Sequence, residues 1–109
     1  MAQRILHIID SLARSGLASQ LLVLSRGLLE KGFDVHVAAL QGRGAQAAEF
    51  RAAGIETTEL NQRWCVDPVA LYQLHRLVRR LQPNTVHTWN YQAGVYGNLS
   101  ARAASIPNV

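Results

Sequence analysis

The chain has 109 residues, of which 49% are hydrophobic and 17% charged, so it forms one domain with a modest core and is not a disordered protein. No apolar run approaches the ~20 residues that a membrane-spanning helix needs. His7 and Asp10 interrupt the N-terminal region where a signal peptide would be apolar. The single cysteine, Cys65, excludes an internal disulfide and a CxxC pair. We therefore expect a cytosolic protein.

The net charge of +4 comes from the C-terminal part of the chain. Residues 1–67 hold seven basic and seven acidic side chains, whereas residues 68–109 hold four arginines and no acid. Three of these, Arg76, Arg79 and Arg80, share one expected helix. A solvated helix surface is the simpler interpretation, and a basic surface for an anionic partner is the alternative. Nucleic acid is not expected, because aromatic residues are few and are not interleaved with the arginines.

Strands and helices alternate in the pattern of residues 4 to 60. The apolar run at 4–10 is too dense for a strand with one solvent-facing side, and it predicts a central strand covered on both faces. A helix is expected from Leu17 to Lys31, followed by a C-cap glycine, Gly32. Its expected buried stripe consists of Leu17, Leu21, Leu24 and Leu28. The next elements are expected to be a strand at 35–40, a helix at 46–53 closed by Gly54, and a strand at 55–60.

The second half of the chain continues this alternation. Asp67-Pro68 predicts a helix start, because Asp caps free amide groups and Pro suits the first helical position. The expected buried stripe of this helix consists of Leu71, Leu74, Val78 and Leu81. After Gln82-Pro83-Asn84 we expect a strand at 85–88, a helix at 93–104 and the start of a further strand at 106–109.

The alternation predicts an α/β fold: a Rossmann-like parallel sheet with helices on both faces, made of four βα units and the start of a fifth strand. In such sheets ligands bind beyond the carboxyl ends of the strands. Three loops follow those ends, at residues 10–16, 41–44 and 87–92.

The first loop, DSLARSG, excludes three kinds of nucleotide or phosphate site. It has one glycine where a dinucleotide fingerprint needs three, it lacks the P-loop pattern, and Asp10 lacks the acidic neighbour of a receiver domain. What remains is Ser11, Ser15 and Gly16 leading into a helix whose backbone amides can bind a diphosphate. The alternative is that Ser15 only caps the helix and Gly16 lets the helix pack near the sheet.

The third loop carries side chains suited to binding a ligand. His87, Trp89, Asn90 and Tyr91 follow or end a buried strand, and they can hydrogen-bond or stack on a sugar or base. The alternative is a polar strand end with Trp89 in the core.

The other three histidines have simpler expected roles. His7 and His36 lie inside strands, where a buried, hydrogen-bonded imidazole is more common than a ligand. His75 lies on the helix with the three arginines. No metal site is expected.

Four segments taken in order point to one family. They read RILHIIDSLARSGLASQLLVLSRGLLEKGFDVHVAAL, AEFRAAGIETTEL, DPVALYQLHRLVRRLQPNTVHTW and NYQAGVYGNLSARAASIPNV. Together they resemble the N-terminal part of retaining GT-B glycosyltransferases of the group 1, family four kind. The resemblance covers essentially the whole chain.

The resemblance implies a two-domain enzyme that moves a sugar from a nucleotide-diphosphate donor to an acceptor hydroxyl, with retention and without a metal cofactor. Residues 1–109 would be its truncated acceptor-side Rossmann-like domain, and the C-terminal donor-binding domain is absent. Of the family's Gly-Gly pair near the donor diphosphate only the second position is matched, by Gly16, with Ser15 in the first. An acid that often follows in the family is replaced by Ala18. The residues implied on the acceptor side are His87, Trp89, Asn90 and Tyr91.

Three further expectations follow from the resemblance. The acceptor is expected to be an envelope polysaccharide or glycolipid at the cytoplasmic membrane face, where Arg76, Arg79 and Arg80 would each contribute about 1 kcal/mol to transient docking. The 109-residue chain alone is expected to transfer no sugar, because the groups that stabilise the leaving diphosphate lie in the absent domain. The rival from another class is a non-catalytic α/β binding or interaction module, since fold does not fix function.

Overall fold

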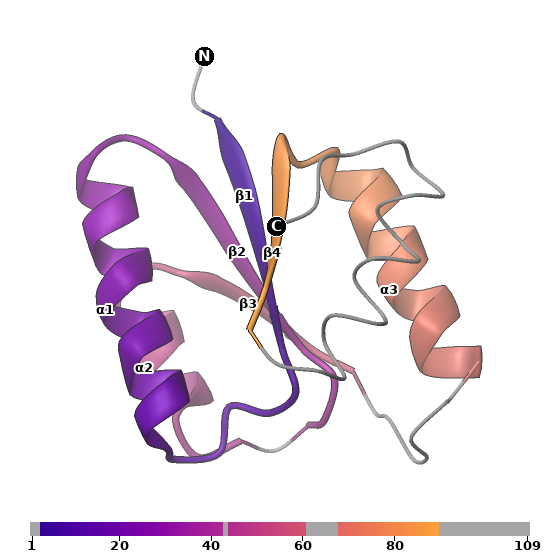
Figure 1. Ribbon diagram of the computed structural model, residues 1–109, viewed down its shortest axis with the longest axis horizontal. Coiled ribbons are helices and arrows are strands. Elements are labelled where there is room, and N and C mark those ends of the chain that lie inside the picture. The colour runs from indigo at the N-terminus through magenta and orange to yellow at the C-terminus, as the bar shows by residue number, and fades with distance from the viewer. Residues whose placement is uncertain (1–2, 43, 61–67, 90–109) are drawn as a thin grey trace.

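The computed structural model describes residues 3–42, 44–60 and 68–89. Strands and helices alternate throughout these residues, as the sequence predicts (Figure 1). The elements are β1 (Arg4–Ile9), α1 (Gly16–Glu30), β2 (Asp34–Ala39), α2 (Ala47–Ala52), β3 (Glu56–Glu59), α3 (Pro68–Leu81) and β4 (Thr85–Thr88). The helix expected at 93–104 and the strand expected at 106–109 lie outside the described residues.

The four strands form one parallel sheet in the order β3-β2-β1-β4. After β1 the chain adds β2 and β3 on one side, and after β3 it crosses to the opposite side to add β4. The direction of strand addition therefore reverses between β1 and β4. In open α/β sheets this reversal, the topological switch point, is where loops diverge and ligands bind.

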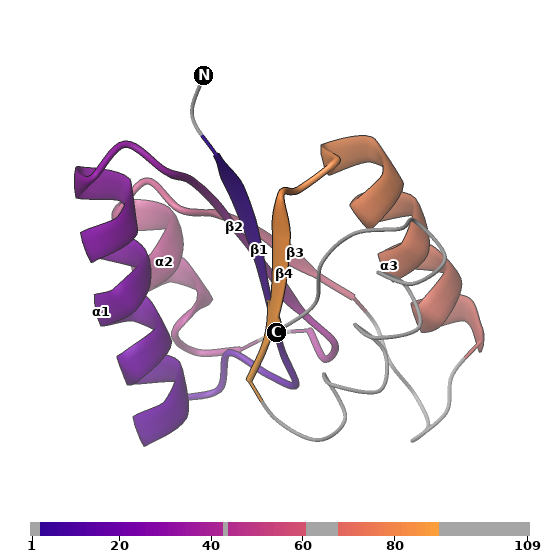
Figure 2. The same ribbon diagram turned by 45° about the horizontal axis from the view of Figure 1, so that its top comes forward.

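Helices cover both faces of the sheet (Figure 2). Successive side chains of a strand point to opposite faces, so Leu6 and Ile8 of β1 pack beneath α3 while Ile9 packs beneath α1 and α2. Each face has its own buried cluster. The predicted Rossmann-like fold with helices on both faces is thus confirmed for the described residues.

Local signals account for the helix boundaries. The Ser15 side chain caps α1 by accepting a hydrogen bond from the amide of Ala18 at 3.1 Å, so α1 begins at Gly16. Gly32 and Gly54, which follow α1 and α2, have φ angles of 90° and 85°. Residues with a Cβ rarely adopt this left-handed conformation, so glycine at these positions ends both helices.

The expected buried stripe of α1 is partly wrong. The buried residues are Ala18, Leu21 and Ser25, whereas Leu24 is 40% exposed. Ala18, Leu21 and Ser25 lie three and four positions apart on one line of the helix, and two of them are small, so the helix axis lies close to the sheet. The larger leucines of α1 flank this line and are less covered.

The stripe of α3 is closer to expectation. Leu74 and Val78 are buried as predicted, Leu71 and Leu81 are partly buried, and Ala70 and Leu77 complete the buried side. No helix within residues 3–42, 44–60 and 68–89 is both long and apolar enough to span a bilayer.

Candidate functional site

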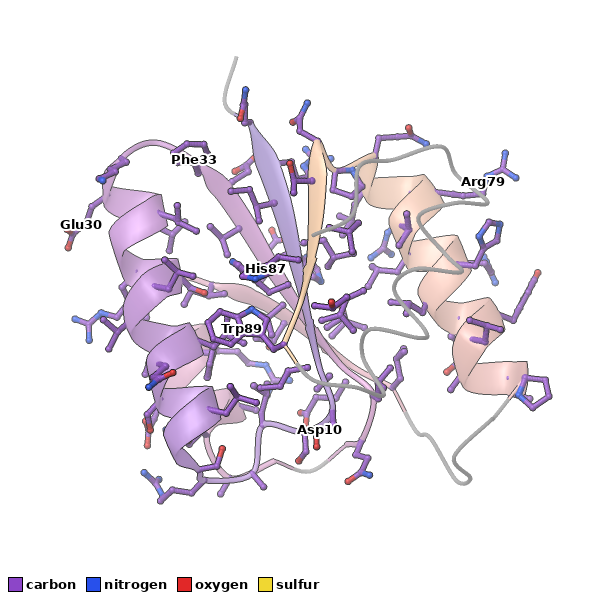
Figure 3. All side chains as sticks on the ribbon, in the orientation of Figure 1. Asp10, Glu30, Phe33, Arg79, His87 and Trp89 are labelled. Atoms are coloured by element: carbon purple, nitrogen blue, oxygen red, sulfur yellow. The ribbon has the colours of Figure 1, made fainter. Side chains whose placement is uncertain are left out.

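The sheet brings two of the predicted loops together. β1 pairs with β4, so the loop after Ile9 and Trp89, which follows Thr88, lie at the same edge of the sheet, at the bottom of Figure 1. The backbone amide of Trp89 donates to the carbonyl of Ile8 at 3.0 Å, which extends this pairing past the end of β4. Asp10 lies at the same edge (Figure 3). The candidate site is this edge of β1 and β4, which is the switch point.

The loop before α1 is built around Ser15 and Gly16. The Ser15 hydroxyl caps the helix, and the backbone amide of Ser15 donates to the side-chain oxygen of Gln46 at 3.2 Å. A Cβ on Gly16 would meet no heavy atom within 4 Å. The capping role of Ser15 is confirmed, whereas the idea that Gly16 permits close packing on the sheet is wrong.

Two first-turn donors of α1 have no acceptor among the described residues. Helical geometry provides no acceptor within the helix for its first amides. Ser15 occupies the Ala18 amide, and the described residues supply no acceptor for the amides of Gly16 and Leu17. These two donors, with the positive end of the helix dipole, are suited to an anion.

The loop at 41–44 has a structural role. The amide of Gln41 donates to the Asp10 carbonyl at 2.8 Å, and the amide of Gly44 donates to the carboxylate of Glu59 at 2.9 Å. A Cβ on Gly44 would lie 2.4 Å from the Leu12 backbone, so the two loops are in close contact. These described residues hold the first loop in place, and they leave the candidate site to the β1 and β4 ends.

At the end of β4 three rings form a compact group, which we call the ring cluster: His7, His87 and Trp89. His7 and His87 are direct partners on β1 and β4, and their ring centroids are 5.3 Å apart. The Trp89 ring centroid lies 5.8 Å from that of His7 and 5.1 Å from that of His87. Figure 3 shows His87 and Trp89 on the side of the sheet that faces α1.

A hydrogen bond defines the protonation of His7. The indole Nε1–H of Trp89 donates to Nδ1 of His7 at 3.0 Å, so the ring proton of His7 lies on Nε2. Nε2 is buried and has no partner among the described residues. Burial, and secondarily the neighbouring His87, lowers the pKa of His7 to about 4. Burial also lowers the pKa of His87. The ring cluster is therefore neutral at pH 7, and it offers hydrogen-bonding and stacking groups without a charge.

The residues predicted to bind a ligand at the β4 end do not share one environment. His87 is half-buried at the edge, and Trp89 packs against the cluster beneath α1 and α2 with its N–H already engaged. Asn90 and Tyr91 lie outside the described residues. Sequence reasoning assigned His7 only a buried role and missed its contact with the β4 end. The signal was available in part, since His7 and His87 both lie near the ends of their strands.

The basic side chains of α3 lie away from the switch point. Arg76, Arg79 and Arg80 are exposed, and Arg79 points outward from the sheet in Figure 3. The guanidinium of Arg76 lies 6.0 Å from the ring centroid of Tyr72. Within the part of the chain that the structure describes, no group of three or more His, Cys, Asp or Glu side chains is arranged to hold a metal ion.

Known structures with this fold include glycosyltransferases. MurG from Acinetobacter baumannii superposes with a TM-score of 0.77 at 18% identity, over 97% of this chain and 33% of that one. Anabaena HepE, solved with UDP and glucose, gives 0.79 at 14% identity, over 97% of this chain and 28% of that one. The chain thus spans a third or less of these enzymes. A domain of the PF1911 hydrogenase of Pyrococcus furiosus also superposes, with a TM-score of 0.65 at 15% identity, over 98% of this chain and 89% of that one.

Sequence comparison decides between these neighbours. No curated protein matches the chain in sequence. The family model of Glycosyltransferase Family 4, however, matches residues 14–109, which is most of the chain and includes Ser15, Gly16 and the end of β4. The chain belongs to Glycosyltransferase Family 4.

Proposed function

We propose that this chain is the N-terminal, acceptor-side domain of a retaining GT-B glycosyltransferase. The parent enzyme transfers a sugar from a nucleotide-diphosphate donor to an acceptor hydroxyl, and it needs no metal cofactor. One observation carries the proposal: β1 and β4 are neighbours across the switch point, so the α1 amides that lack an acceptor among the described residues and the side chains of His87 and Trp89 flank one edge. An anionic donor and a polar acceptor would meet there.

The donor contact is proposed at Ser15 and Gly16. No heavy atom lies within 4 Å of the Cβ position of Gly16, so the backbone is accessible there, and the amides of Gly16 and Leu17 are the proposed donors to a diphosphate. HepE, a structural neighbour, was solved with UDP, which is consistent with a nucleotide-diphosphate donor. Most donor contacts are proposed to lie in a second domain, because Arg14, the basic side chain of the described 10–16 loop, is already paired with Glu49 at 2.8 Å.

The acceptor contact is proposed at His87, Trp89, Asn90 and Tyr91. His87 is neutral, half-buried and at the edge, so its ring can exchange hydrogen bonds with hydroxyl groups without attracting anions. The indole N–H of Trp89 is held by His7, which leaves only a ring surface for stacking on a sugar. The acceptor class that we propose is an envelope polysaccharide or glycolipid.

Transfer by the 109-residue chain alone is expected to be undetectable. Cleaving the bond between sugar and diphosphate requires fixed positive groups on the leaving oxygens, and loss of one such donor costs about 3 kcal/mol or roughly a hundredfold in rate. Incubation of the purified chain with radiolabelled nucleotide sugars and a panel of glycan acceptors tests this. Turnover above a blank would show that the chain is a complete catalyst.

The acceptor assignment is tested by binding. We expect soluble glycosides to shift the backbone amide resonances of Thr88 and Trp89 saturably, and His87→Ala to abolish this response. His75→Ala, which alters a histidine on α3 instead, is the matched control and should bind as the wild type does. Tight binding of nucleotide diphosphates that depends on His87, with no response to glycosides, would reverse the assignment.

The second candidate is a non-catalytic α/β binding module. It is favoured by one observation, namely that the PF1911 hydrogenase domain shares the fold over nearly its whole length. Such a module would show no glycoside response that depends on His87. The glycoside titration described above therefore separates the candidates.

We also propose transient contact with the cytoplasmic membrane face through Arg76, Arg79 and Arg80. Each arginine near an anionic bilayer contributes about 1 kcal/mol, which supports reversible docking but not anchoring. Sedimentation with phosphatidylglycerol vesicles should be stronger than with phosphatidylcholine vesicles and should weaken at high salt. Equal sedimentation with both lipids would contradict the proposed membrane contact.

A further inference from the structure

A groove runs along the outer side of the domain, between α3 and the edge strand β3. Its volume is about 660 Å³. The helix packs over the central strands, where it covers Leu6, Ile8 and Val86, and β3 lies at the sheet edge beyond this cover. The groove is lined by Thr58, Glu59, Leu60, Gln73, Arg76, Leu77, Arg79 and Arg80. It is separate from the edge of β1 and β4 that carries the proposed glycosyl-transfer site.

One wall of the groove is positively charged. Gln73, Arg76 and Arg80 are spaced by three and four positions on α3, so they lie along one side of the helix. Among the described residues no carboxylate pairs with the arginines of this wall. Elsewhere in the described chain the arginines at positions 4, 14 and 51 each pair with an acid, at 3.8, 2.8 and 3.2 Å. The groove thus concentrates uncompensated guanidinium groups.

The strand side of the groove does not neutralise this charge. Glu59 is its one acidic residue among the described lining residues, and its carboxylate accepts hydrogen bonds from Arg51 at 3.2 Å and from the Gly44 amide at 2.9 Å. Both partners lie toward the face of the sheet covered by α2. The Thr58 hydroxyl carries no charge, and its hydrogen bond with Nε2 of His36, at 2.8 Å, fixes its position. Among the described residues that line the groove, no carboxylate is therefore free to repel an anion.

We infer that this groove binds the phosphate group of a phosphomonoester. Guanidinium groups bind phosphate oxygens in bidentate geometry, and two or three of them around one space suit a dianion better than a monoanion. Gln73 adds an amide donor. A volume of about 660 Å³ exceeds that of a phosphate alone and falls in the range of small-molecule sites, so it also receives the organic part of the ligand. The ligand is either a soluble phosphate ester or a lipid headgroup, and both present the same chemistry.

The inference does not depend on glycosyl transfer and is tested on the 109-residue chain by amide NMR. The probes are inorganic phosphate, glycerol 3-phosphate and short-chain dihexanoyl phosphatidic acid below its micelle concentration. We expect saturable shifts of the amides of Thr58, Leu60 and Leu77. Arg76→Gln/Arg80→Gln should weaken binding of all three probes by about tenfold or more, because charged hydrogen bonds are lost.

The matched control is Arg26→Gln/Lys31→Gln. It removes the same charge from exposed positions at α1 and its C-cap, on the opposite face of the sheet, and should leave affinity unchanged. Tighter binding of the lipid than of glycerol phosphate identifies a headgroup as the ligand, and the reverse identifies a soluble ester. The inference is overturned by equal weakening in both double variants, or by no saturable shift up to tens of millimolar phosphate. If the chain sediments with anionic vesicles but the phosphate probes cause no saturable amide shifts, the membrane proposal stands and phosphate binding in the groove is refuted.

Discussion

Two buried histidines on neighbouring strands satisfy their ring nitrogens differently. His36 on β2, 5% exposed, contacts Glu56 through Nδ1 at 3.3 Å and Thr58 through Nε2 at 2.8 Å. His7 on β1, 1% exposed, accepts one hydrogen bond from Trp89, and its Nε2 has no partner among the described residues. The fully bonded ring lies on the face under α3, and the half-bonded ring lies beside the candidate site.

Burial lowers the pKa of both rings, but the neighbouring groups differ. For His36 the hydrogen bond and charge of Glu56 oppose the effect of burial, while Arg80 and Arg4 add to it. For His7 no acid opposes burial, and His87 adds to it. His36 has a partner at each ring nitrogen, so losing one of them leaves the other bond in place. His7 has a single described partner, so losing Trp89 would leave both of its buried ring nitrogens without a hydrogen bond among the described residues.

The largest expected effect is the loss of stability in acid caused by His7. Its pKa is 6.5 when unfolded and about 4 when folded, so between these values the unfolded chain binds a proton that the folded chain does not. Stability is therefore complete above pH 6.5 and falls as the pH drops toward 4, by about 3 kcal/mol in total. Urea denaturation at a series of pH values measures this loss.

The matched variant for the acid effect is His7→Asn, which cannot titrate and retains an acceptor near the position of Nδ1. Its stability at pH 7 will differ, but its slope between pH 6.5 and 4 should be clearly shallower than that of the wild type. The remaining slope includes His36, whose pKa is also lowered. Identical slopes in the two proteins would show that His7 is not the main proton-binding group.

The second effect is the loss of the indole hydrogen bond. Trp89→Phe leaves Nδ1 of buried His7 without a donor, which should cost about 2 kcal/mol in free energy of unfolding, as measured by urea denaturation followed by circular dichroism. Tyr72→Phe, at an aromatic residue 61% exposed, is the control and should change stability by less than about 0.5 kcal/mol.

A double-mutant cycle checks that the Trp89 effect arises from this pair. His7→Leu combined with Trp89→Phe removes both the donor and the acceptor, so the double variant should be more stable than the sum of the single effects predicts. Strict additivity would mean that the two side chains do not interact in solution.

The smallest effect concerns His36. Thr58→Val keeps the shape of the side chain and removes the hydroxyl bonded to Nε2, which should cost about 1 kcal/mol. Glu56→Gln should cost less than about 0.5 kcal/mol, because the Glu56 side chain is 78% exposed and its contact with His36 is solvated. Both values come from urea denaturation at pH 7. A larger cost for Glu56→Gln would make the acid, and not Thr58, the main anchor of His36.

Much of the fold is predictable because its signals are local. Ser15, Gly32 and Gly54 mark helix ends through their own hydrogen bonding or φ angles, and dense apolar runs mark the strands. The assignment of Leu24 to the buried side of α1 failed because small residues, Ala18 and Ser25, set the line of contact. Hydrophobicity alone does not show which side of a leucine-rich helix lies closest to a sheet.

The candidate site was only half predictable for a related reason. His87 was found because it lies near the carboxyl end of a predicted strand, and Ser15 because it precedes a predicted helix; both are properties of position along the chain. The role of His7 was missed because it depends on Trp89, which is 82 residues away in sequence. The groove between α3 and β3 likewise joins side chains that are distant along the chain.

By itself the sequence determined the alternation of strands and helices, their ends and the residues at the carboxyl ends of the strands, since periodicity, capping and turn chemistry act over a few residues. Only the tertiary structure decided that β4 lies beside β1, that Trp89 bonds to His7, and that the α3 arginines border a groove. Strand order and packing depend on contacts between distant segments, and no local pattern specifies which segments become neighbours.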